Sequence, residues 1–178
     1  MQVISIPYTH YHLGPSGLIG LLLLKWVDFP TLLIASVILD IEGISVLVFN
    51  LSYPLHGYFH SFLGATLAAL LVILLMKYLR KYFSPTMAVF KVKQDFTLRS
   101  ISIGAFLGTF SHILLDAMLY GEMNPFFPLT GNPFLIESSF TRFYMLTFCT
   151  FCALGALLTY FIKLTIQILK NKKSDLNS

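Results

Sequence analysis

The chain has 178 residues, of which 56% are hydrophobic and only 11% are charged, and its formal net charge is +4. Soluble domains carry about 25% charged residues, so this composition excludes an ordinary soluble domain and indicates an integral membrane protein. The basic residues form no stripe interleaved with polar residues, which excludes nucleic acid as a partner. We expect residues 1–178 to fold as a single all-α domain, a polytopic bundle of membrane helices.

Hydropathy predicts five membrane spans, which in chain order cover residues 14–27, 30–50, 57–79, 100–120 and 141–169. The first is short, since a hydrocarbon core about 30 Å thick needs roughly 20 helical residues. Phe29 and Pro30 separate it from the second span, because proline suits the first turn of a helix. A segment rich in Pro, Gly and Phe, residues 121–140, joins the last two spans.

The basic residues predict how the bundle lies in the membrane. They cluster between the third and fourth spans and at the C-terminus: Lys77, Arg80, Lys81, Lys91, Lys93 and Arg99, then Lys163, Lys170, Lys172 and Lys173. Cytoplasmic segments carry an excess of Lys and Arg, so both clusters should face the cytoplasm. We therefore expect a multi-pass protein of the prokaryotic cytoplasmic membrane. Its N-terminus and residues 121–140 should lie outside, and its C-terminus should be cytoplasmic.

The five histidines and most of the membrane-embedded carboxylates share a few short motifs. A charge near the middle of a bilayer costs about 3 kcal/mol even on the lenient insertion scale, so such groups rarely lack a function. Counted at about 1.5 Å per helical residue, all of the motifs fall toward the outer side of the predicted bundle. The motifs are Thr9-His10-Tyr11-His12, Asp40-Ile41-Glu42, the segment from His56 to His60-Ser61, and the segment from Ser111-His112 to Asp116.

Two pairs of these residues have a spacing that suits a helix. His56 and His60 are four residues apart, and so are His112 and Asp116. On a helix, each pair would present both side chains to one face. Two side chains of one helical turn can then bind the same metal ion.

Two other pairs are spaced by two residues. Asp40 and Glu42 would point roughly 200° apart on a regular helix, so either only one faces the site or the helix breaks near Gly43. We favour Asp40 as the ligand, with Glu42 as its partner in the site or as a general base. His10 and His12 would share a face only in an extended segment, so we expect one of them to bind.

Histidine and carboxylate together are ligands for a divalent transition metal, and zinc is the metal that we expect. A set of roughly six to eight ligands is too large for one tetrahedral zinc ion. It suits two ions about 3.5–4 Å apart, bridged by a carboxylate and a water. The predicted metal ligands are His10, His12, Asp40, His56, His60, His112 and Asp116.

A pair of bound ions predicts hydrolysis of a phosphoester, because it activates the bridging water and holds both oxygens of an in-line displacement. Glu42 and Asp40 are the predicted catalytic carboxylates. Arg142, at the outer start of the fifth span, is the predicted substrate-binding residue, since a guanidinium can hold a phosphate with two hydrogen bonds. A site in the outer half of the membrane would meet a headgroup, so the expected substrate is a membrane lipid.

The motifs resemble those of small prokaryotic membrane proteins described as metal-dependent hydrolases, the YdjM-like or LexA-binding inner-membrane group. The resemblance covers roughly residues 9–128 and depends most on the string from Ser111 to Asp116, followed by Tyr120-Gly121. The chain lacks the arginine of the family string His-Arg-Gly-x-Thr-His-Ser. It also has Glu42 in place of the second acid of an Asp-x-Asp element. The resemblance implies a membrane-embedded hydrolase.

The order of the motifs is also similar to the ligand order of zinc-dependent phospholipase C, a helical enzyme that binds several zinc ions. This likeness implies a phospholipase C-like phosphohydrolase. It also implies carboxylate ligands at Asp40 and Asp116, beside His10 or His12, His60 and His112.

Two other functions remain open. A transporter of metal ions or protons would use the acids and histidines as a relay. Polar residues should then continue to the inner side, but Leu67–Met76 and Ile101–Phe106 hold almost none. A b-type haem protein would use histidines of facing helices as axial ligands, without neighbouring acids. Cys149 and Cys152 lie in an apolar stretch, and we interpret them as packing residues without a redox function.

Overall fold

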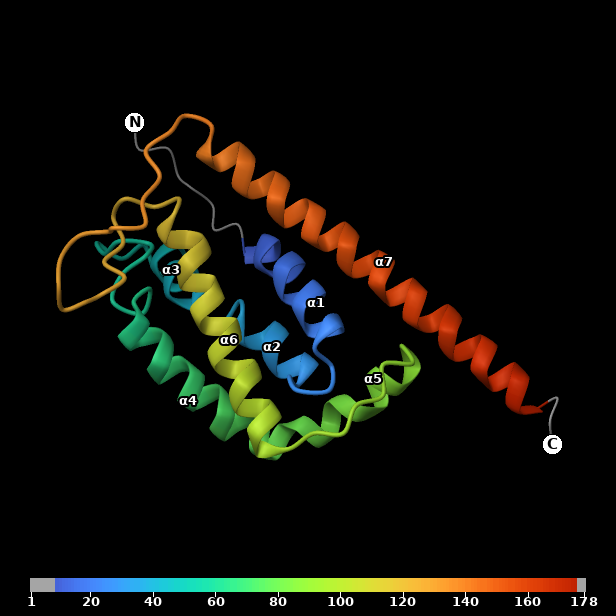
Figure 1. Ribbon diagram of the computed structural model, residues 1–178. Coiled ribbons are helices and arrows are strands. Elements are labelled where there is room, and N and C mark those ends of the chain that lie inside the picture. The colour runs from blue at the N-terminus through green and yellow to red at the C-terminus, as the bar shows by residue number, and fades with distance from the viewer. Residues whose placement is uncertain (1–8, 176–178) are drawn as a thin grey trace.

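The computed structural model describes residues 9–175, and these residues form helices and loops without any strand. The three long helices are α4 (Phe62–Leu79), α6 (Leu98–Ala117) and α7 (Thr141–Asp175) (Figure 1). The shorter helices are α1 (Leu13–Leu22), α2 (Phe29–Ala35), α3 (Asp40–Val48) and α5 (Ser84–Val89), with 3-10 turns η1 (Thr9–His12) and η2 (Arg80–Phe83). The predicted class, an all-α membrane bundle, is confirmed.

Helix α6 lies at the centre of the bundle. It packs against α4 on one side and against α2 on the other, while α1 lies between α2 and α7. The close approach of α6 to α2 depends on glycine. A Cβ atom at Gly108 would lie 2.6 Å from the Cβ of Ala35 and 2.8 Å from the carbonyl oxygen of Leu32. Small residues spaced by four let membrane helices pack closely, and Gly104 precedes Gly108 at that spacing.

Side-chain caps fix where the long helices begin. At the start of α4, the hydroxyl of Ser61 accepts a hydrogen bond of 3.1 Å from the backbone N–H of Gly64. At the start of α6, Thr97 and Ser100 form a reciprocal capping box. The cap at Ser61 corrects the prediction of a helix from residue 57. His56 and His60 lie in the loop before α4, so they are not neighbours on a helix face.

Residues 9–175 contain fewer candidate membrane spans than the five predicted. Within the described part of the chain, three helical segments are long and apolar enough to cross a membrane: Phe62–Val89, Leu98–Ala117 and Thr141–Ser174. Helices α2 and α3 meet at a bend of 43°. If the two together form one span, the number of candidate spans rises to four. The expected first span corresponds to α1. Its 10 residues rise only about 15 Å, half of the hydrocarbon core.

The break between α2 and α3 lies earlier than Gly43. Helix α2 ends at Ala35, and residues 36–39 form a turn. In this turn the hydroxyl of Ser36 donates to the carbonyl oxygen of Leu33 at 2.9 Å. Serine side chains that bind backbone groups in this way compete with helical hydrogen bonds. The turn brings the start of α3 beside the end of α6.

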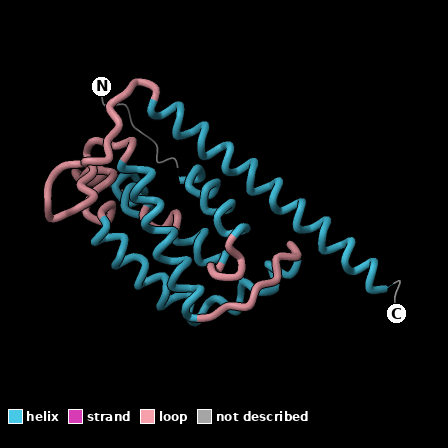
Figure 2. The backbone as a smooth tube through the Cα atoms, in the orientation of Figure 1, coloured by secondary structure: helices cyan, strands magenta, loops and turns pink. Residues whose placement is uncertain are grey.

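The loops 49–61 and 118–140 lie together where α6 ends, and we call this the loop end of the bundle (Figure 2). The backbone N–H of Phe62 donates to the carbonyl oxygen of Pro125 at 2.8 Å, which joins the loop 118–140 to the start of α4, directly after the loop 49–61. The side chain of Asn132 donates to the carbonyl oxygens of Ala117 and Tyr120 at 2.7 and 3.0 Å. These bonds hold the second loop against the last turn of α6.

The opposite end of α6, which we call the basic end, contains a buried ion pair. The guanidinium of Arg80 donates from Nε to Oδ1 of Asp28, and both side chains are completely buried. Beside this pair, Gln94 donates to the carbonyl oxygen of Leu24 at 2.6 Å and accepts from the N–H of Phe29 at 3.0 Å. These contacts join the α1–α2 turn to η2 and to the loop before α6.

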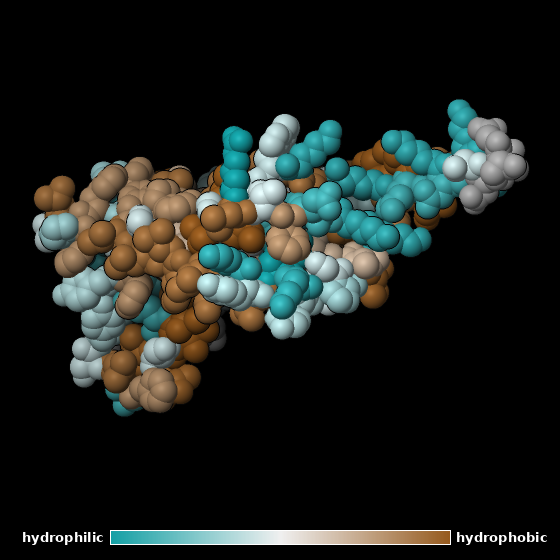
Figure 3. Space-filling model, turned by 90° about the horizontal axis from the view of Figure 1, so that it is seen from below, coloured by the Kyte–Doolittle hydropathy of each residue, from teal (hydrophilic) through white to brown (hydrophobic). Residues whose placement is uncertain are grey.

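Hydrophilic side chains gather toward the C-terminal end of α7 (Figure 3).

Candidate metal centre

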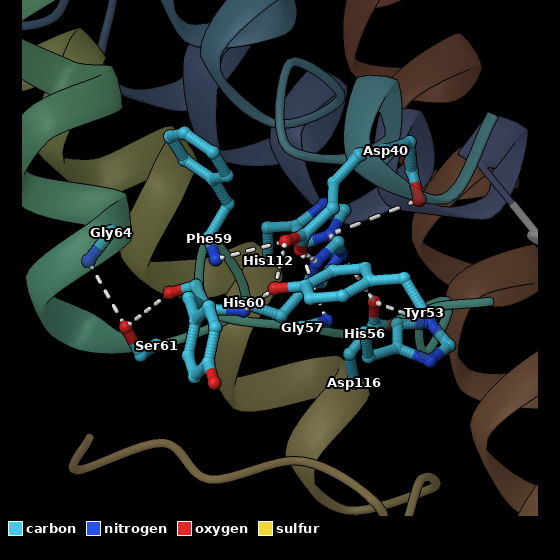
Figure 4. Close-up of polar contacts among 12 residues, drawn as sticks. Asp40, Tyr53, His56, Gly57, Phe59, His60, Ser61, Gly64, His112 and Asp116 are labelled. Atoms are coloured by element: carbon cyan, nitrogen blue, oxygen red, sulfur yellow. Dashed lines mark hydrogen bonds and ion pairs between the residues drawn. The ribbon is translucent and has the colours of Figure 1, made fainter. Parts of the chain in front are cut away.

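Six buried histidine and aspartate side chains meet near the loop end of the bundle, and Figure 4 labels five of them, Asp40, His56, His60, His112 and Asp116. They come from η1, from the start of α3, from the loop before α4 and from the last turns of α6: His12, Asp40, His56, His60, His112 and Asp116. Gly104, Gly108, His112 and Asp116 follow one another at intervals of four along α6, so they share one face. The face that packs closely on α2 therefore continues into this cluster.

The possible ligand atoms form two groups, and within each group they lie within 4.8 Å of one another. One group contains His12, Asp40, His112 and Asp116, and the other contains His56, His60 and Asp116. The two oxygens of Asp116 face different histidines. Oδ1 lies 3.2 Å from Nε2 of His12, and Oδ2 lies 3.1 Å from Nε2 of His112. A carboxylate shared in this way can bridge two ions.

Three of the histidines direct Nδ1 away from the cluster, toward an acceptor. The pairs are His60 with Glu42 Oε2 at 2.7 Å, His56 with Glu122 Oε1 at 2.9 Å and His112 with the carbonyl oxygen of Ser36 at 2.8 Å. A carboxylate and a carbonyl only accept hydrogen bonds, so Nδ1 carries the proton of each neutral ring. Nε2 then offers its lone pair to the cluster, which is how histidine ligands of metal ions are oriented.

These lone pairs converge on one place. Nε2 of His60 and Nε2 of His112 lie only 3.3 Å apart, and Oδ2 of Asp116 lies 3.1 Å from the latter. Two ligands of a tetrahedral zinc ion are separated by about 3.3 Å, given bonds of about 2.0–2.1 Å. Acceptors at such distances repel one another unless a cation lies between them. The donor set and its spacing therefore fit a metal ion.

Two buried atoms of the cluster also lack a hydrogen-bond partner. Among the described residues, Nδ1 of His12 and Oδ2 of Asp40 are the buried side-chain atoms in this state. Buried polar atoms nearly always have a partner, so such exceptions require an explanation. A metal ion held at the cluster, together with the water bound to it, would supply such partners, because both residues belong to the same group around Asp116.

Glu42 holds both His60 and the loop that carries it. Its Oε1 accepts hydrogen bonds from the hydroxyl of Tyr53 and the N–H of Phe59, both at 3.2 Å. Its Oε2 accepts from the N–H of Gly57 at 3.1 Å and from His60. Burial lowers the pKa of His60, which favours the neutral ring that a metal ion needs.

His56 is held in place by the loop 118–140. Its ring stacks on the ring of Tyr120, with centroids 3.8 Å apart. The hydrogen bond from His56 lowers the pKa of Glu122, so this carboxylate stays ionised and keeps accepting. The segment after α6 therefore supplies two contacts that orient one histidine.

The chain as a whole matches the model of one protein family, described as YdjM inner membrane protein, over residues 8–173. The chain belongs to this family. No curated protein and no solved structure matches it. The family match extends beyond the residues 9–128 that the motifs covered, and it agrees with the apolar helices in showing a membrane protein.

Of the predicted metal ligands in this YdjM family member, six lie together and one does not. His10 is exposed in η1 and belongs to neither group of ligand atoms, whereas His12 is buried in the cluster. His56 and His60 reach the cluster from a loop, and not from the helix face that their spacing predicted. The six residues therefore lie together as the sequence predicted, and their binding of metal stays a prediction.

The residues predicted for catalysis and substrate binding lie in different surroundings. Asp40 is buried within the cluster, and its Oδ2 lacks a partner among the described residues. Both oxygens of Glu42 accept hydrogen bonds. Arg142 is exposed in the first turn of α7 and belongs to neither group of ligand atoms. Its binding of a phosphate stays a prediction.

Two partners of the histidines were not predicted from the sequence. Glu122 follows Asp116 by six residues and is one of two acids in the segment 121–140. The general need of a metal-binding histidine for a second acceptor could have identified it. The carbonyl of Ser36 could not be found in this way. It is free to accept from His112 only because α2 ends at Ala35, and a single serine is too weak a signal to predict that end from the sequence.

Proposed function

We propose that the protein is a membrane-embedded metal-dependent hydrolase that cleaves a phosphoester of a lipid, with zinc as its metal. The observation that supports this proposal best is the convergence of histidine Nε2 atoms on Asp116, while Nδ1 of three rings is fixed by an acceptor behind it. Neutral imidazoles and carboxylates in this arrangement are the ligands of hydrolytic zinc sites.

The two groups of ligand atoms indicate how the chain would hold two ions. His12, Asp40 and His112 would hold one, and His56 and His60 would hold the other. Asp116 would bind both, since it belongs to both groups. When bound, such a pair supplies an activated water and positive charge for the oxygens of a phosphoester.

Asp40 is the carboxylate best placed to accept a proton. Its buried Oδ2 has no hydrogen-bond partner within residues 9–175, whereas both oxygens of Glu42 are already occupied by donors. In the proposed reaction, water attacks phosphorus and passes a proton to Oδ2 of Asp40, while the bond from phosphorus to the oxygen of diacylglycerol breaks. The leaving oxygen then takes up the proton from Asp40. Glu42 acts as a positioning residue, because it orients His60.

The surroundings of the cluster favour a lipid as substrate. Tyr58 and Phe59, next to His60 in the sequence, expose 61% and 54% of their surface, and Phe126 in the neighbouring loop exposes 44%. Tyrosine is enriched where a membrane meets water, and exposed phenylalanine beside it suits contact with lipid. A reaction centre beneath such residues would meet the phosphoester of a lipid headgroup.

The decisive test compares Asp116→Asn with Glu137→Gln, which removes an exposed acid of the loop 118–140. Both proteins are purified at full length, their metal is measured by mass spectrometry, and release of phosphate or phosphorylated headgroup is measured on vesicles of phosphatidic acid and phosphatidylglycerol. Asp116→Asn should bind metal more than about 100-fold more weakly and lose hydrolysis. A ligand shared by two ions contributes more to metal affinity than a residue that only orients a ligand, whose loss costs about 10–100-fold. Glu137→Gln should change neither property.

Two results would count against the proposal. Full metal content in Asp116→Asn would place the site elsewhere. Wild-type protein that holds metal but hydrolyses no lipid phosphoester would favour the transporter. Asp40→Asn adds a separate test of the proton acceptor. It should retain more metal than Asp116→Asn but lose about 10²–10⁴ in rate, the usual contribution of general base catalysis.

The structure favours neither of the alternative functions over hydrolysis. A haem protein would use histidines without neighbouring acids, whereas Asp40 and Asp116 lie among the histidines of the cluster. A relay for transport would need charged groups that continue across the bundle. Asp28 and Arg80 are buried at the basic end, but they neutralise each other in an ion pair.

A further inference from the structure

Two hollows meet at the basic end, between α7 and the loop after α5. The larger is a groove of about 760 Å³ between α1, α2, α5 and α7. The smaller is a pocket of about 170 Å³, whose polar lining residues include Lys91, Lys93, Lys163 and Gln167. The two hollows share four lining residues, Leu21, Phe90, Val92 and Tyr160, so they adjoin each other.

The pocket provides positive charge from two directions. Its lining contains three lysines and no acidic residue. Lys163 lies one turn before Gln167 on the same face of α7. Lys91 and Lys93 come from the loop after α5, which is held to α7 by a hydrogen bond of 3.1 Å from the hydroxyl of Tyr160 to the carbonyl oxygen of Phe90. Basic pockets between membrane helices bind the phosphates of lipid headgroups.

The groove has the lining expected of a site for a hydrocarbon chain. Leucine, isoleucine, valine, phenylalanine, alanine and glycine make up most of it, with Leu33, Ile34 and Leu157 as examples. Its walls include α2 and α7, which belong to candidate membrane spans, so the apolar molecules that can reach it are lipid tails. Its volume lies within the range of roughly 300–1,000 Å³ that is usual for ligand pockets.

We propose that this site binds one anionic phospholipid, with the headgroup phosphate against Lys91, Lys93 and Lys163 and an acyl chain in the groove. The six residues of the candidate metal centre do not line either hollow. The inference therefore does not depend on the proposed hydrolysis. Because α7 packs chiefly on α1, a lipid between α1, α2, α5 and α7 would also fasten this helix to the bundle.

Native mass spectrometry of the full-length protein in detergent tests the headgroup. Phosphatidylglycerol should bind as one molecule per chain, phosphatidylcholine should bind more weakly, and glycerol 3-phosphate should neither bind nor compete. The triple variant Lys91→Gln, Lys93→Gln, Lys163→Gln should bind phosphatidylglycerol roughly 100-fold more weakly, since each lysine near a membrane contributes about a factor of five. The control replaces Lys170, Lys172 and Lys173 with Gln, removes the same charge outside the pocket, and should bind as wild type.

A second pair of variants tests the groove. Leu157 lines it and Leu158, the next residue, does not, although the two are similarly exposed, at 55% and 62%. Leu157→Trp should lower the occupancy of phosphatidylglycerol at least about tenfold, while Leu158→Trp should leave it unchanged. Equal binding by these two variants, or by the two lysine triples, would overturn the proposal.

Other results separate the possible errors. If phosphatidylcholine binds as tightly as phosphatidylglycerol, the proposed preference for an anionic headgroup is wrong. If glycerol 3-phosphate competes with the lipid, the pocket binds a soluble phosphate instead. Unchanged thermal stability of the lipid-free variants establishes that they are folded. Asp116→Asn should bind phosphatidylglycerol as wild type, so loss of hydrolysis alone leaves this inference intact.

Discussion

Glu42 and Glu122 each accept a hydrogen bond from Nδ1 of one histidine, but their surroundings differ. Glu42 receives further bonds from Tyr53 and from two backbone N–H groups. The side chain of Glu122 exposes 44% of its surface. An exposed hydrogen bond competes with water and holds its partner less firmly than a half-buried one. Both carboxylates therefore orient a histidine, and Glu42 should hold His60 more firmly than Glu122 holds His56.

Replacing each of these acids with glutamine tests their roles as positioning residues. Glu42→Gln should lower metal affinity about 10–100-fold, the usual effect of losing an outer partner of a histidine ligand. Glu122→Gln should have an effect below about tenfold, because water can replace the lost acceptor. Competition with a chelator of known affinity measures both. A larger loss in Glu122→Gln would contradict the ranking.

At the scale of helices, the contact of α2 with α6 determines the position of the cluster. Nδ1 of His112 reaches the carbonyl oxygen of Ser36 at 2.8 Å only because Gly108 lets the two backbones approach. A side chain at Gly108 would move α2 away and leave His112 without its acceptor. The site therefore depends on a residue that holds no ligand atom.

Gly108→Ala tests this dependence, with Gly17→Ala as its control. The new methyl at Gly108 would lie 2.6 Å from Ala35. We expect a loss of about 1–3 kcal/mol in the free energy of unfolding, as is usual for overpacking, together with weaker metal binding. At Gly17 the nearest atom is 3.6 Å away, so alanine should be neutral or stabilising by up to about 1 kcal/mol. Thermal melting and metal titration measure both variants. Equal behaviour would show that the contact has no special role.

The sequence predicted the long helices better than the short ones. The bounds of α6 and the start of α7 lie near the predicted 100–120 and 141–169, because long apolar runs locate these helices and caps such as Thr97 then set the first residue. Helix α7 continues past its apolar run to Asp175. The ends of α1 and α2 depend on distant contacts, such as the bond from Phe29 to Gln94, 65 residues later. His56 and His60 were predicted to act together from a helical spacing. They meet instead because Glu42, Glu122 and Tyr120 hold a loop.

For the whole molecule, the orientation in the membrane stays a prediction. The segment 121–140 should face outside and the basic end should face the cytoplasm, while residues 1–8, expected outside, are not among the described residues. Thr130 and Asp95 are both exposed and lie at opposite ends of α6. Their positions suit a labelling experiment.

In a background with Cys149→Ala and Cys152→Ala, Thr130→Cys should react with an impermeant thiol reagent in intact cells. Asp95→Cys should react only after the cells are opened, because the positive-inside rule puts its loop in the cytoplasm. Mass tagging of the labelled protein measures both reactions. The opposite pattern would reverse the predicted orientation, although the cluster would remain at one end of the bundle.

Thermal melting and limited proteolysis in detergent test whether metal stabilises the fold. A chelator should lower the melting temperature and expose the loop 49–61 to cleavage, because a ligand that binds only the folded chain stabilises it. Added zinc should reverse both effects. Wild-type melting that does not depend on zinc would contradict this expectation.

The ligands of the cluster come from segments that are far apart in the sequence. Asp40 follows His12 by 28 residues, His56 follows Asp40 by 16, and His112 follows His60 by 52. Closing such loops removes chain entropy, and bound ions would keep them closed as disulfides do in secreted proteins. Free metal at about 1,000 times its dissociation constant would add about 4 kcal/mol to folding. The metal supply of the cell would then set how many copies escape quality control and persist in the membrane.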